Sequence, residues 1–212
     1  MQRHINLADR ELATAQMAVS RETLDRLDAF VGLLAEWSKI TDLISDAAWP
    51  TLWTRHIADC AQLLALGPAA KTWLDLGSGA GFPGLILAIL IADQPAAKVT
   101  LVESDKRKAA FLSEAGRALS LPVTVYGKRI EKAINENSEP PDIITARALA
   151  PLSRLLQMTG PLILKGAVAL FLKGKSLPDE LTPKIASDRF AFETIPSRTS
   201  PDGHILRVRR KS

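Results

Sequence analysis

A glycine-rich segment between two apolar runs constrains the fold of this chain more than any other part of its sequence. Residues 71–84 read Lys-Thr-Trp-Leu-Asp-Leu-Gly-Ser-Gly-Ala-Gly-Phe-Pro-Gly, and an apolar run over 85–91 follows them. This order predicts a buried strand, a tight turn and the start of a helix. The glycines allow positive φ angles and let a ligand lie against bare backbone. Because the first N–H groups of a helix are unpaired and carry its positive dipole end, we expect a nucleotide-like ligand there.

The segment fits two nucleotide-binding patterns, which differ in register. Residues 79–84 match G-x-G-x-x-G, the dinucleotide pattern of NAD-dependent enzymes. Asp75, Gly77, Gly79 and Gly81 instead match the S-adenosylmethionine loop of class I methyltransferases. In this second register the first glycine directly follows the strand, where a tight turn is needed. The sequence therefore favours S-adenosylmethionine and leaves NAD open.

A second acidic residue ends the next predicted strand. Residues 98–103 read as a buried strand that ends at Glu103, about 20 residues beyond the glycines. A carboxylate at this place can accept hydrogen bonds from both ribose hydroxyls, so we predict that Glu103 binds the cofactor. Ser104 and Asp105 are N-cap candidates for a helix over 106–119. The first turn of this helix carries three cations, Lys106, Arg107 and Lys108. They form either a solvated basic face or contacts to a polyanion.

Composition narrows the possible classes of site and location. The 212 residues are 47% apolar, enough for one core and a smaller appendage, and the net charge of +4 permits a nucleic-acid partner without requiring one. A single cysteine, Cys60, excludes a disulfide framework and a cysteine-based zinc site, and we expect no metal. The chain shows no signal peptide, and its longest apolar run is far shorter than the ~18 residues that span a bilayer. We therefore expect a cytoplasmic protein without membrane contact.

The chain divides into a helical part, residues 1–68, and an α/β part, residues 69–212. Apolar residues recur on one face of a helix between Ser20, its N-cap candidate, and Trp37. Pro50 is placed to open another helix, which Gly67 and Pro68 end. We predict an N-terminal helical extension ahead of a ligand-binding domain.

Strands and helices alternate after residue 70, which indicates a parallel sheet with helices on both faces. The turn-rich segment 197–203 predicts an antiparallel hairpin at the end of the chain. Five parallel strands closed by such a hairpin are the plan of class I methyltransferases, a Rossmann-like doubly wound sheet, here with an N-terminal helical cap. The predicted strands are 71–76, 98–103, 122–126, 142–146, 167–172, 189–195 and 204–209.

The chemistry available to the chain is limited. Residues 140–147 lack the polar–Pro–Pro–aromatic signature of amino-group methyltransferases, and Cys60 lies in the helical part, where we expect a small core residue. A nucleophile that needs no base suits this sequence. Guanine N7 has an exposed lone pair that can attack a sulfonium methyl directly, so the protein need mainly align the two reactants.

Two basic residues follow the fourth and fifth predicted strands, at the edge where doubly wound sheets bind ligands. Arg147 is our candidate catalytic residue, and it can bind guanine O6, an RNA phosphate or the methionine carboxylate. Lys173 is a candidate phosphate or cofactor contact, with a solvated lysine as the alternative. The predicted contacts to an RNA substrate are Lys106, Arg107, Lys128, Arg129, Lys173 and Arg209.

These residues together resemble a known family over nearly the whole chain. The chain is similar to the bacterial small-subunit (16S) ribosomal RNA guanine-N7 methyltransferases, also called glucose-inhibited division protein B. The Gly-Phe-Pro-Gly ending of the glycine loop and the Arg-His-Ile-x-Asp string are fairly specific in combination. The matching segments are Trp37-Ser-Lys, Arg55-His56-Ile57-Ala-Asp59, Asp75 to Gly84, Ala146-Arg147-Ala148 and Leu172-Lys173-Gly174.

The resemblance implies S-adenosyl-L-methionine as cofactor and 16S ribosomal RNA or the 30S subunit as partner. It places the cofactor against Gly77, Phe82, Ile130, Glu131 and Arg147, and Ile130 and Glu131 would hold the adenine. The loop glycines Gly79 and Gly81 and the acid Glu103 complete the predicted cofactor site.

The chain departs from the family pattern at three places. The family's usual Trp-Asn-Lys-x-x-Asn-Leu-Thr is Trp37-Ser-Lys-Ile-Thr-Asp-Leu-Ile here, its Asp-Ser is Asp59-Cys60, and its Ser-Arg-Ala begins with Ala146. None of these changes touches the glycine loop. For His56 we expect a structural role at the junction of the two parts.

The sequence thus predicts a monomeric methyltransferase that forms 7-methylguanosine in small-subunit ribosomal RNA. Two alternatives remain: an NAD-linked oxidoreductase that uses the 79–84 register, and a non-catalytic RNA-binding ribosome assembly factor on the same fold.

Overall fold

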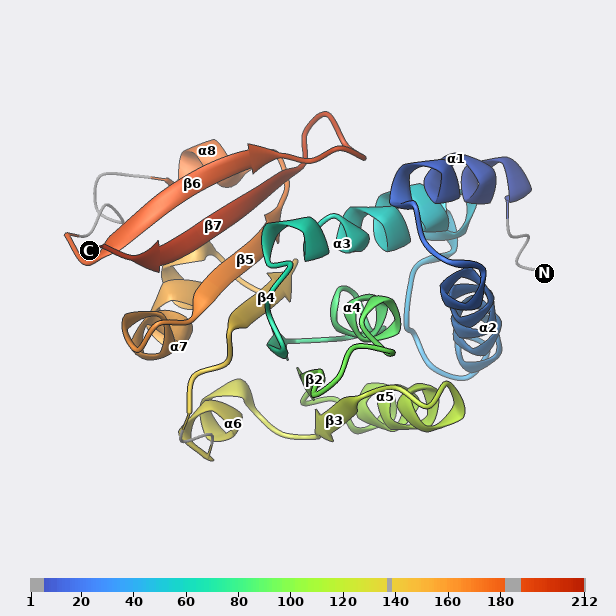
Figure 1. The fold of residues 1–212 in the computed structure, drawn as a ribbon, viewed down its shortest axis with the longest axis horizontal. Coiled ribbons are helices and arrows are strands. Elements are labelled where there is room, and N and C mark those ends of the chain that lie inside the picture. Colours follow the sequence, from blue (N-terminus) through green and yellow to red (C-terminus); the bar gives the residue numbers. More distant parts are fainter. Residues whose placement is uncertain (1–5, 137–138, 182–187, 212) are drawn as a thin grey trace.

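Seven strands join in one hydrogen-bonded sheet in the computed structural model, which describes residues 6–136, 139–181 and 188–211 (Figure 1). The strand order across the sheet is β3-β2-β1-β4-β5-β7-β6. The bounds are β1 Thr72–Leu76, β2 Lys98–Val102, β3 Val123–Tyr126, β4 Ile143–Arg147, β5 Val168–Lys173, β6 Phe190–Pro196 and β7 His204–Arg210.

Strand directions follow the predicted plan. Strands β1 to β5 are parallel, and β1 lies between β2 and β4, so that Leu74 pairs with Thr100 on one side and with Ile144 on the other. Strand β7 runs antiparallel to both β5 and β6. All seven predicted strands are present within one residue at each end. The predicted doubly wound sheet with an antiparallel C-terminal hairpin is confirmed.

Each face of the sheet has its own hydrophobic core, because successive side chains of a strand point to opposite faces. Trp73 packs with α4 and α5 on one face, and Leu74 packs with α6, α7 and α8 on the other. These helices are α4 Gly84–Leu90, α5 Lys106–Ala118, α6 Ile130–Glu136, α7 Leu152–Leu164 and α8 Leu177–Glu180. Asp105 is the N-cap of α5, where its side chain accepts the N–H groups of Arg107 and Lys108, as predicted.

The N-terminal helices extend the first of these cores. Helix α1 spans Leu7–Met17 and α2 spans Arg21–Trp37, with Ser20 as the predicted N-cap of α2. The buried face of α2 carries Leu27, Phe30 and Leu34, which belong to the same hydrophobic cluster as α4 and α5. The division at residue 68 stays a prediction, and this shared core makes the N-terminal helices a covering layer on the sheet domain.

The predicted helix that begins at Pro50 is wrong at its start. Pro50 lies inside a 3-10 helix, Asp46–Thr51, and a π-helical segment, Trp53–Ala58, leads into α3 Asp59–Ala61 and a 3-10 turn Leu64–Leu66. The carboxylate of Asp9 accepts the N–H of Trp53 at 2.8 Å, so this N–H is not available to the preceding turn. A distant side chain therefore interrupts the regular helix. No helix among the described residues is long and apolar enough to cross a membrane.

Candidate active site

Loops at the carboxyl ends of β1 to β4 enclose a cavity of about 380 Å³, which we call the first cavity. This edge is where doubly wound parallel sheets bind ligands. The cavity brings together six of the predicted cofactor contacts, which follow four different strands: Gly77, Gly79, Glu103, Ile130, Glu131 and Arg147.

The three loop glycines have different surroundings. Gly79 has a φ of 55°, and a Cβ atom built on it would meet nothing closer than 3.8 Å, so bare backbone faces the cavity. A Cβ on Gly77 would lie 2.5 Å from Leu149. A Cβ on Gly81 would lie 2.5 Å from Leu85 of α4, and Gly81 does not line the cavity. Gly81 therefore serves the packing of the loop on α4.

Glu103 holds the glycine loop at the end of β2. One of its oxygens accepts the N–H of Gly79 at 2.9 Å, and the other accepts the N–H of Asp105 at 2.8 Å. Each carboxylate oxygen keeps a second lone pair, so both can still accept a hydroxyl hydrogen. The carboxylate is thus oriented by the backbone toward the first cavity.

Asp75, at the end of β1, anchors the glycine loop through hydrogen bonds to β4 and to the start of α4. Its carboxyl group is 1% exposed and accepts hydrogen bonds from Thr145 Oγ1 at 2.8 Å and from the N–H of Gly84 at 3.2 Å. Burial raises the pKa of Asp75 to about 6. These bonds fix β1 to β4 and fix the start of α4 to the end of β1.

Phe82 does not line the first cavity. Its ring is buried, with its centre 5.7 Å from that of Phe30 of α2 and 5.2 Å from that of His56. Burial lowers the pKa of His56 to about 3, and the positive charges of Arg147 and Arg55 act in the same direction, so the imidazole is neutral at pH 7. Phe82 and His56 thus join the N-terminal layer to the glycine loop.

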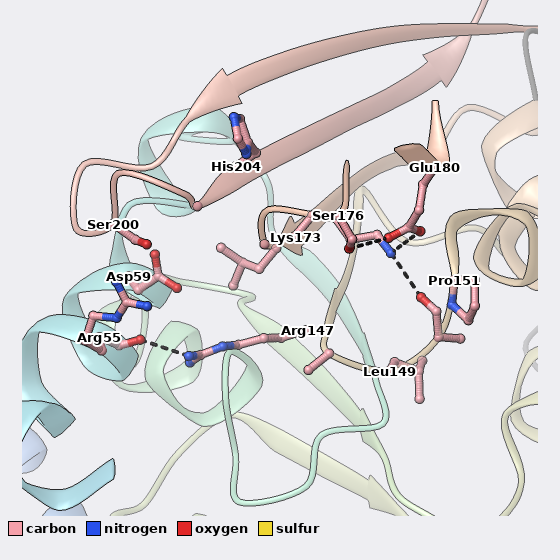
Figure 2. Close-up of a pocket in the computed structure, with 15 residues that line it drawn as sticks. Arg55, Asp59, Arg147, Leu149, Pro151, Lys173, Ser176, Glu180, Ser200 and His204 are labelled. Atoms are coloured by element: carbon pink, nitrogen blue, oxygen red, sulfur yellow. Dashed lines mark hydrogen bonds and ion pairs between the residues drawn. The ribbon is translucent and has the colours of Figure 1, made fainter. Parts of the chain in front are cut away.

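A second cavity of about 540 Å³ lies on the other side of the loop after β4 (Figure 2). The two cavities share the segment 147–150 as a wall. The rest of the second cavity comes from three other parts of the chain: the N-terminal layer with Arg55 and Asp59, the segment that follows β5, and the hairpin with Ser200 and His204. Two adjacent compartments with a common wall suit a reaction between two bound molecules.

Arg147 lies at this wall, at the end of β4. Its Nη2 donates to the backbone carbonyl of Arg55 at 2.9 Å (Figure 2). Its Nη1 lies 3.7 Å from Cys60 Sγ. The guanidinium is 6.0 Å from the centre of the Phe82 ring. Cys60 itself is fully buried, as predicted for a small core residue. The guanidinium is thus held against the N-terminal layer, and each Nη nitrogen keeps one further N–H for a ligand.

The ammonium group of Lys173 is buried and bound by other groups of the protein. Its side chain is 9% exposed, and its Nζ contacts Glu180 Oε2 at 2.7 Å and donates to the carbonyl of Ala150 at 3.1 Å (Figure 2). Glu180 also accepts from the N–H of Leu152 at 2.5 Å and from Ser176 Oγ at 3.0 Å. This network ties the segment after β5 to the wall between the cavities, so Lys173 positions the wall through Ala150.

The other predicted RNA contacts are spread over the surface. Lys106 and Arg107 are exposed in the first turn of α5, and Arg129 is exposed at the first cavity. Lys128 pairs with Glu136 and lies over the ring of Tyr126. Arg209 is exposed near the end of β7, beside Val208, which pairs with Ala169 near the start of β5. Arg209 therefore lies at the sheet edge opposite the two cavities.

Sequence reasoning assigned no role to a polar cluster that joins the hairpin to the N-terminal layer. Asp59 Oδ1 accepts from Ser197 Oγ at 2.9 Å, Thr199 Oγ1 at 2.7 Å and Gln62 Nε2 at 2.8 Å. The signals were present as the Arg-His-Ile-x-Asp string and the Ser- and Thr-rich turn, but their contact joins residues about 140 positions apart.

Within the described parts of the chain, no three His, Cys, Asp or Glu side chains gather closely enough to hold a metal ion.

Comparison with solved structures agrees with this fold. A putative O-methyltransferase from Klebsiella pneumoniae superposes with a TM-score of 0.61 at 15% identity, covering 98% of both chains. A mutant of MtNAS, solved in complex with S-adenosylmethionine, superposes with a TM-score of 0.57 at 18% identity, covering 88% of this chain and 75% of that one. These likenesses assign the class I methyltransferase fold.

Sequence comparison assigns the family. The model of the family GidB, rRNA small subunit methyltransferase G, matches residues 23–201. Proteins named ribosomal RNA small subunit methyltransferase G are 47% identical in Parvibaculum lavamentivorans, covering 96% of this chain and 90% of that protein, and 50% identical in Gluconobacter oxydans, covering 90% and 95%. The chain therefore belongs to the rRNA small subunit methyltransferase G family.

Proposed function

We infer that this protein transfers a methyl group from S-adenosyl-L-methionine to N7 of a guanosine in 16S ribosomal RNA. The observation that carries this inference is the pair of cavities that meet at Arg147 and the wall 147–150. One compartment is lined by the glycine loop and an acidic strand end, as a nucleoside-containing cofactor requires. The other is open beside it and is large enough for a nucleobase. The family, whose members are named for methylation of small-subunit ribosomal RNA, supports the same activity.

The residues of the first cavity fit S-adenosylmethionine. Gly79 leaves room for a ligand against its backbone, and Glu103 offers two oriented oxygens to the ribose hydroxyls. Ile130 would pack on the adenine ring, and Glu131 lies beside it, in an ion pair with Arg154. Arg147 would bind the methionine carboxylate or an RNA phosphate with its remaining N–H groups.

The reaction asks little acid–base chemistry of the protein. Bound in the first cavity, S-adenosylmethionine would supply a methyl group on a positively charged sulfur. Guanine N7 carries a lone pair without a proton, so no side chain has to act as a general base. The protein would hold the base in the second cavity and align N7 with the methyl group, and alignment alone can supply a large part of the rate enhancement. The network of Lys173, Glu180 and Ala150 keeps the wall between the reactants in place.

The partner we propose is 16S ribosomal RNA, presented free or in the 30S subunit. Exposed cations at or beside the two cavities are candidate phosphate contacts: Arg55, Arg129, and Lys106 and Arg107, which precede the cavity residue Lys108. We propose a cytoplasmic location, because such an RNA substrate is found there. We propose that it acts as a monomer, with the N-terminal helical layer supplying Arg55 and Asp59 to the substrate side.

Methyl transfer in vitro tests this function. Purified protein should transfer tritiated methyl groups to 30S subunits from a strain that lacks the gene, and nucleoside analysis should find 7-methylguanosine. A Gly79→Val variant is the inactive control, because its side chain would enter the open space of the first cavity and because a β-branched residue is strained at the φ of 55° that the loop requires. Binding of NAD without binding of S-adenosylmethionine would favour an oxidoreductase. Binding of RNA without methyl transfer would favour an assembly factor.

A further inference from the structure

We propose that Asp59 recognises the Watson–Crick edge of the target guanine in the second cavity. The inference rests on the proposed function and adds to it the residue that selects guanine over other bases. Asp59 and Glu180 are the two acidic side chains that line this cavity. Glu180 is engaged by Lys173, Ser176 and the N–H of Leu152. Asp59 is therefore the acid of this cavity with capacity for a ligand.

The hydrogen bonds of Asp59 leave one of its oxygens free. Three donors converge on Oδ1, from Ser197, Thr199 and Gln62, at distances of 2.7–2.9 Å. No described residue donates to Oδ2. The carboxylate is thus held in one orientation by Oδ1, and Oδ2 remains as an oriented acceptor in a cavity that also contains Arg147 (Figure 2).

The position of Asp59 suits recognition of a base. It lies one helical turn after Arg55, whose carbonyl accepts from Arg147 at the wall between the cavities. A base whose N7 lies at this wall has room to direct its six-membered ring toward the N-terminal layer and the hairpin. These are the elements that carry Asp59 and its three donors.

A carboxylate oxygen at this edge selects guanine by charge and hydrogen-bond pattern. The N1–H and exocyclic amino groups of guanine are both donors, and a charged acceptor makes stronger hydrogen bonds with them than a neutral one. Adenine has a lone pair at N1, which a carboxylate oxygen would repel. With adenine in the cavity, the Asp59 oxygen would have no hydrogen-bond partner at N1. This unpaired acceptor disfavours adenine as much as the hydrogen bonds favour guanine.

The test is the Asp59→Asn variant, assayed on two forms of the 30S subunit. One form carries guanosine at the nucleotide that nucleoside mapping identifies, and the other carries inosine, which lacks the exocyclic amino group. Asparagine keeps an oxygen for the three donors but presents an N–H₂ group in place of Oδ2. We expect kcat/KM on guanosine to fall at least about tenfold, as loss of a hydrogen bond to a charged group implies. The wild type should prefer guanosine to inosine, and the variant should lose this preference.

Thr199→Val is the matched control, because it removes one donor to Oδ1 and leaves the carboxylate intact. It should retain the preference for guanosine. Calorimetric binding of S-adenosylhomocysteine should be equal in all three proteins, which reports an intact first cavity. A wild type that does not distinguish inosine from guanosine, or an Asp59→Asn variant that keeps the wild-type preference, would overturn the proposal. Absence of methyl transfer by the wild type would instead contradict the proposed function.

Discussion

Replacing Asp75 with asparagine should stabilise the protein at neutral pH. The carboxyl group is 1% exposed, and burial raises its pKa from 3.8 to about 6. Hydrogen bonds from the Ser78 and Thr145 side chains and from the N–H of Gly84 oppose this shift, and the nearby charge of Glu103 adds to it. An asparagine of nearly the same shape can accept the Gly84 N–H and donate to the Thr145 hydroxyl oxygen. The variant keeps the hydrogen bonds and removes a buried charge.

The magnitude follows from the pKa shift. Because the folded state holds the proton more tightly than the unfolded state, the stabilisation from the neutral carboxyl is complete below the unfolded pKa of 3.8. It is lost as the pH rises through the folded pKa of about 6. A difference of about 2 units corresponds to about 3 kcal/mol. The stability of Asp75→Asn relative to the wild type should therefore grow by up to about 3 kcal/mol between about pH 4 and pH 7.

Urea unfolding at several pH values, monitored by tryptophan fluorescence, measures this difference in unfolding free energy. Asp142→Asn is the matched control, and Asp142 directly precedes β4. Partial burial would raise the pKa of Asp142, but hydrogen bonds from Thr72 and Lys71 outweigh burial and lower it. Its charged form is the stabilised one, so Asp142→Asn should lose stability relative to the wild type as the pH rises. A stability difference between Asp75→Asn and the wild type that does not change with pH would refute the reasoning.

Three further substitutions test the two cavities. Glu103→Ala should weaken S-adenosylhomocysteine binding at least about tenfold in calorimetry, because it removes two predicted hydrogen bonds to ribose. Arg147→Lys should retain the fold and slow methyl transfer by about ten- to a hundredfold, because lysine keeps the charge but not the planar fork. Glu180→Gln should lower the unfolding free energy by about 3 kcal/mol, because it leaves Lys173, 9% exposed, without its charged partner.

Each of these results has a contrary outcome. Unchanged calorimetry for Glu103→Ala would remove Glu103 from the cofactor site. Full activity of Arg147→Ala on 30S subunits would make Arg147 a structural residue that holds Arg55. Wild-type urea stability of Glu180→Gln would show that solvent reaches the ion pair of Lys173 freely.

Much of the fold could be predicted because it follows from local patterns. The apolar runs located every strand, and the turn-rich segment 197–203 located the hairpin. The caps at Ser20 and Asp105 were predicted because an N-cap depends on residues within three positions. The irregular helix near Trp53 could not be predicted, since Asp9, 44 positions away, takes its N–H.

The candidate site could be predicted only in part. Gly77, Gly79, Glu103 and Ile130 follow strands directly, so the parallel topology brings them to one edge. The engagement of Lys173 depends on Glu180, whose position is set by tertiary packing. Arg209 was predicted as an RNA contact with no position relative to the site, and the antiparallel direction of β7 places it at the sheet edge opposite the two cavities.

The central claim is methylation of guanosine N7 in small-subunit ribosomal RNA, and nucleoside analysis in cells tests it most directly. Ribosomal RNA from a strain that lacks the gene should lose one 7-methylguanosine from 16S RNA. The wild-type gene should restore it, and the Gly79→Val gene should not, because that side chain would enter the first cavity. An unchanged 7-methylguanosine content in the strain that lacks the gene would contradict the claim.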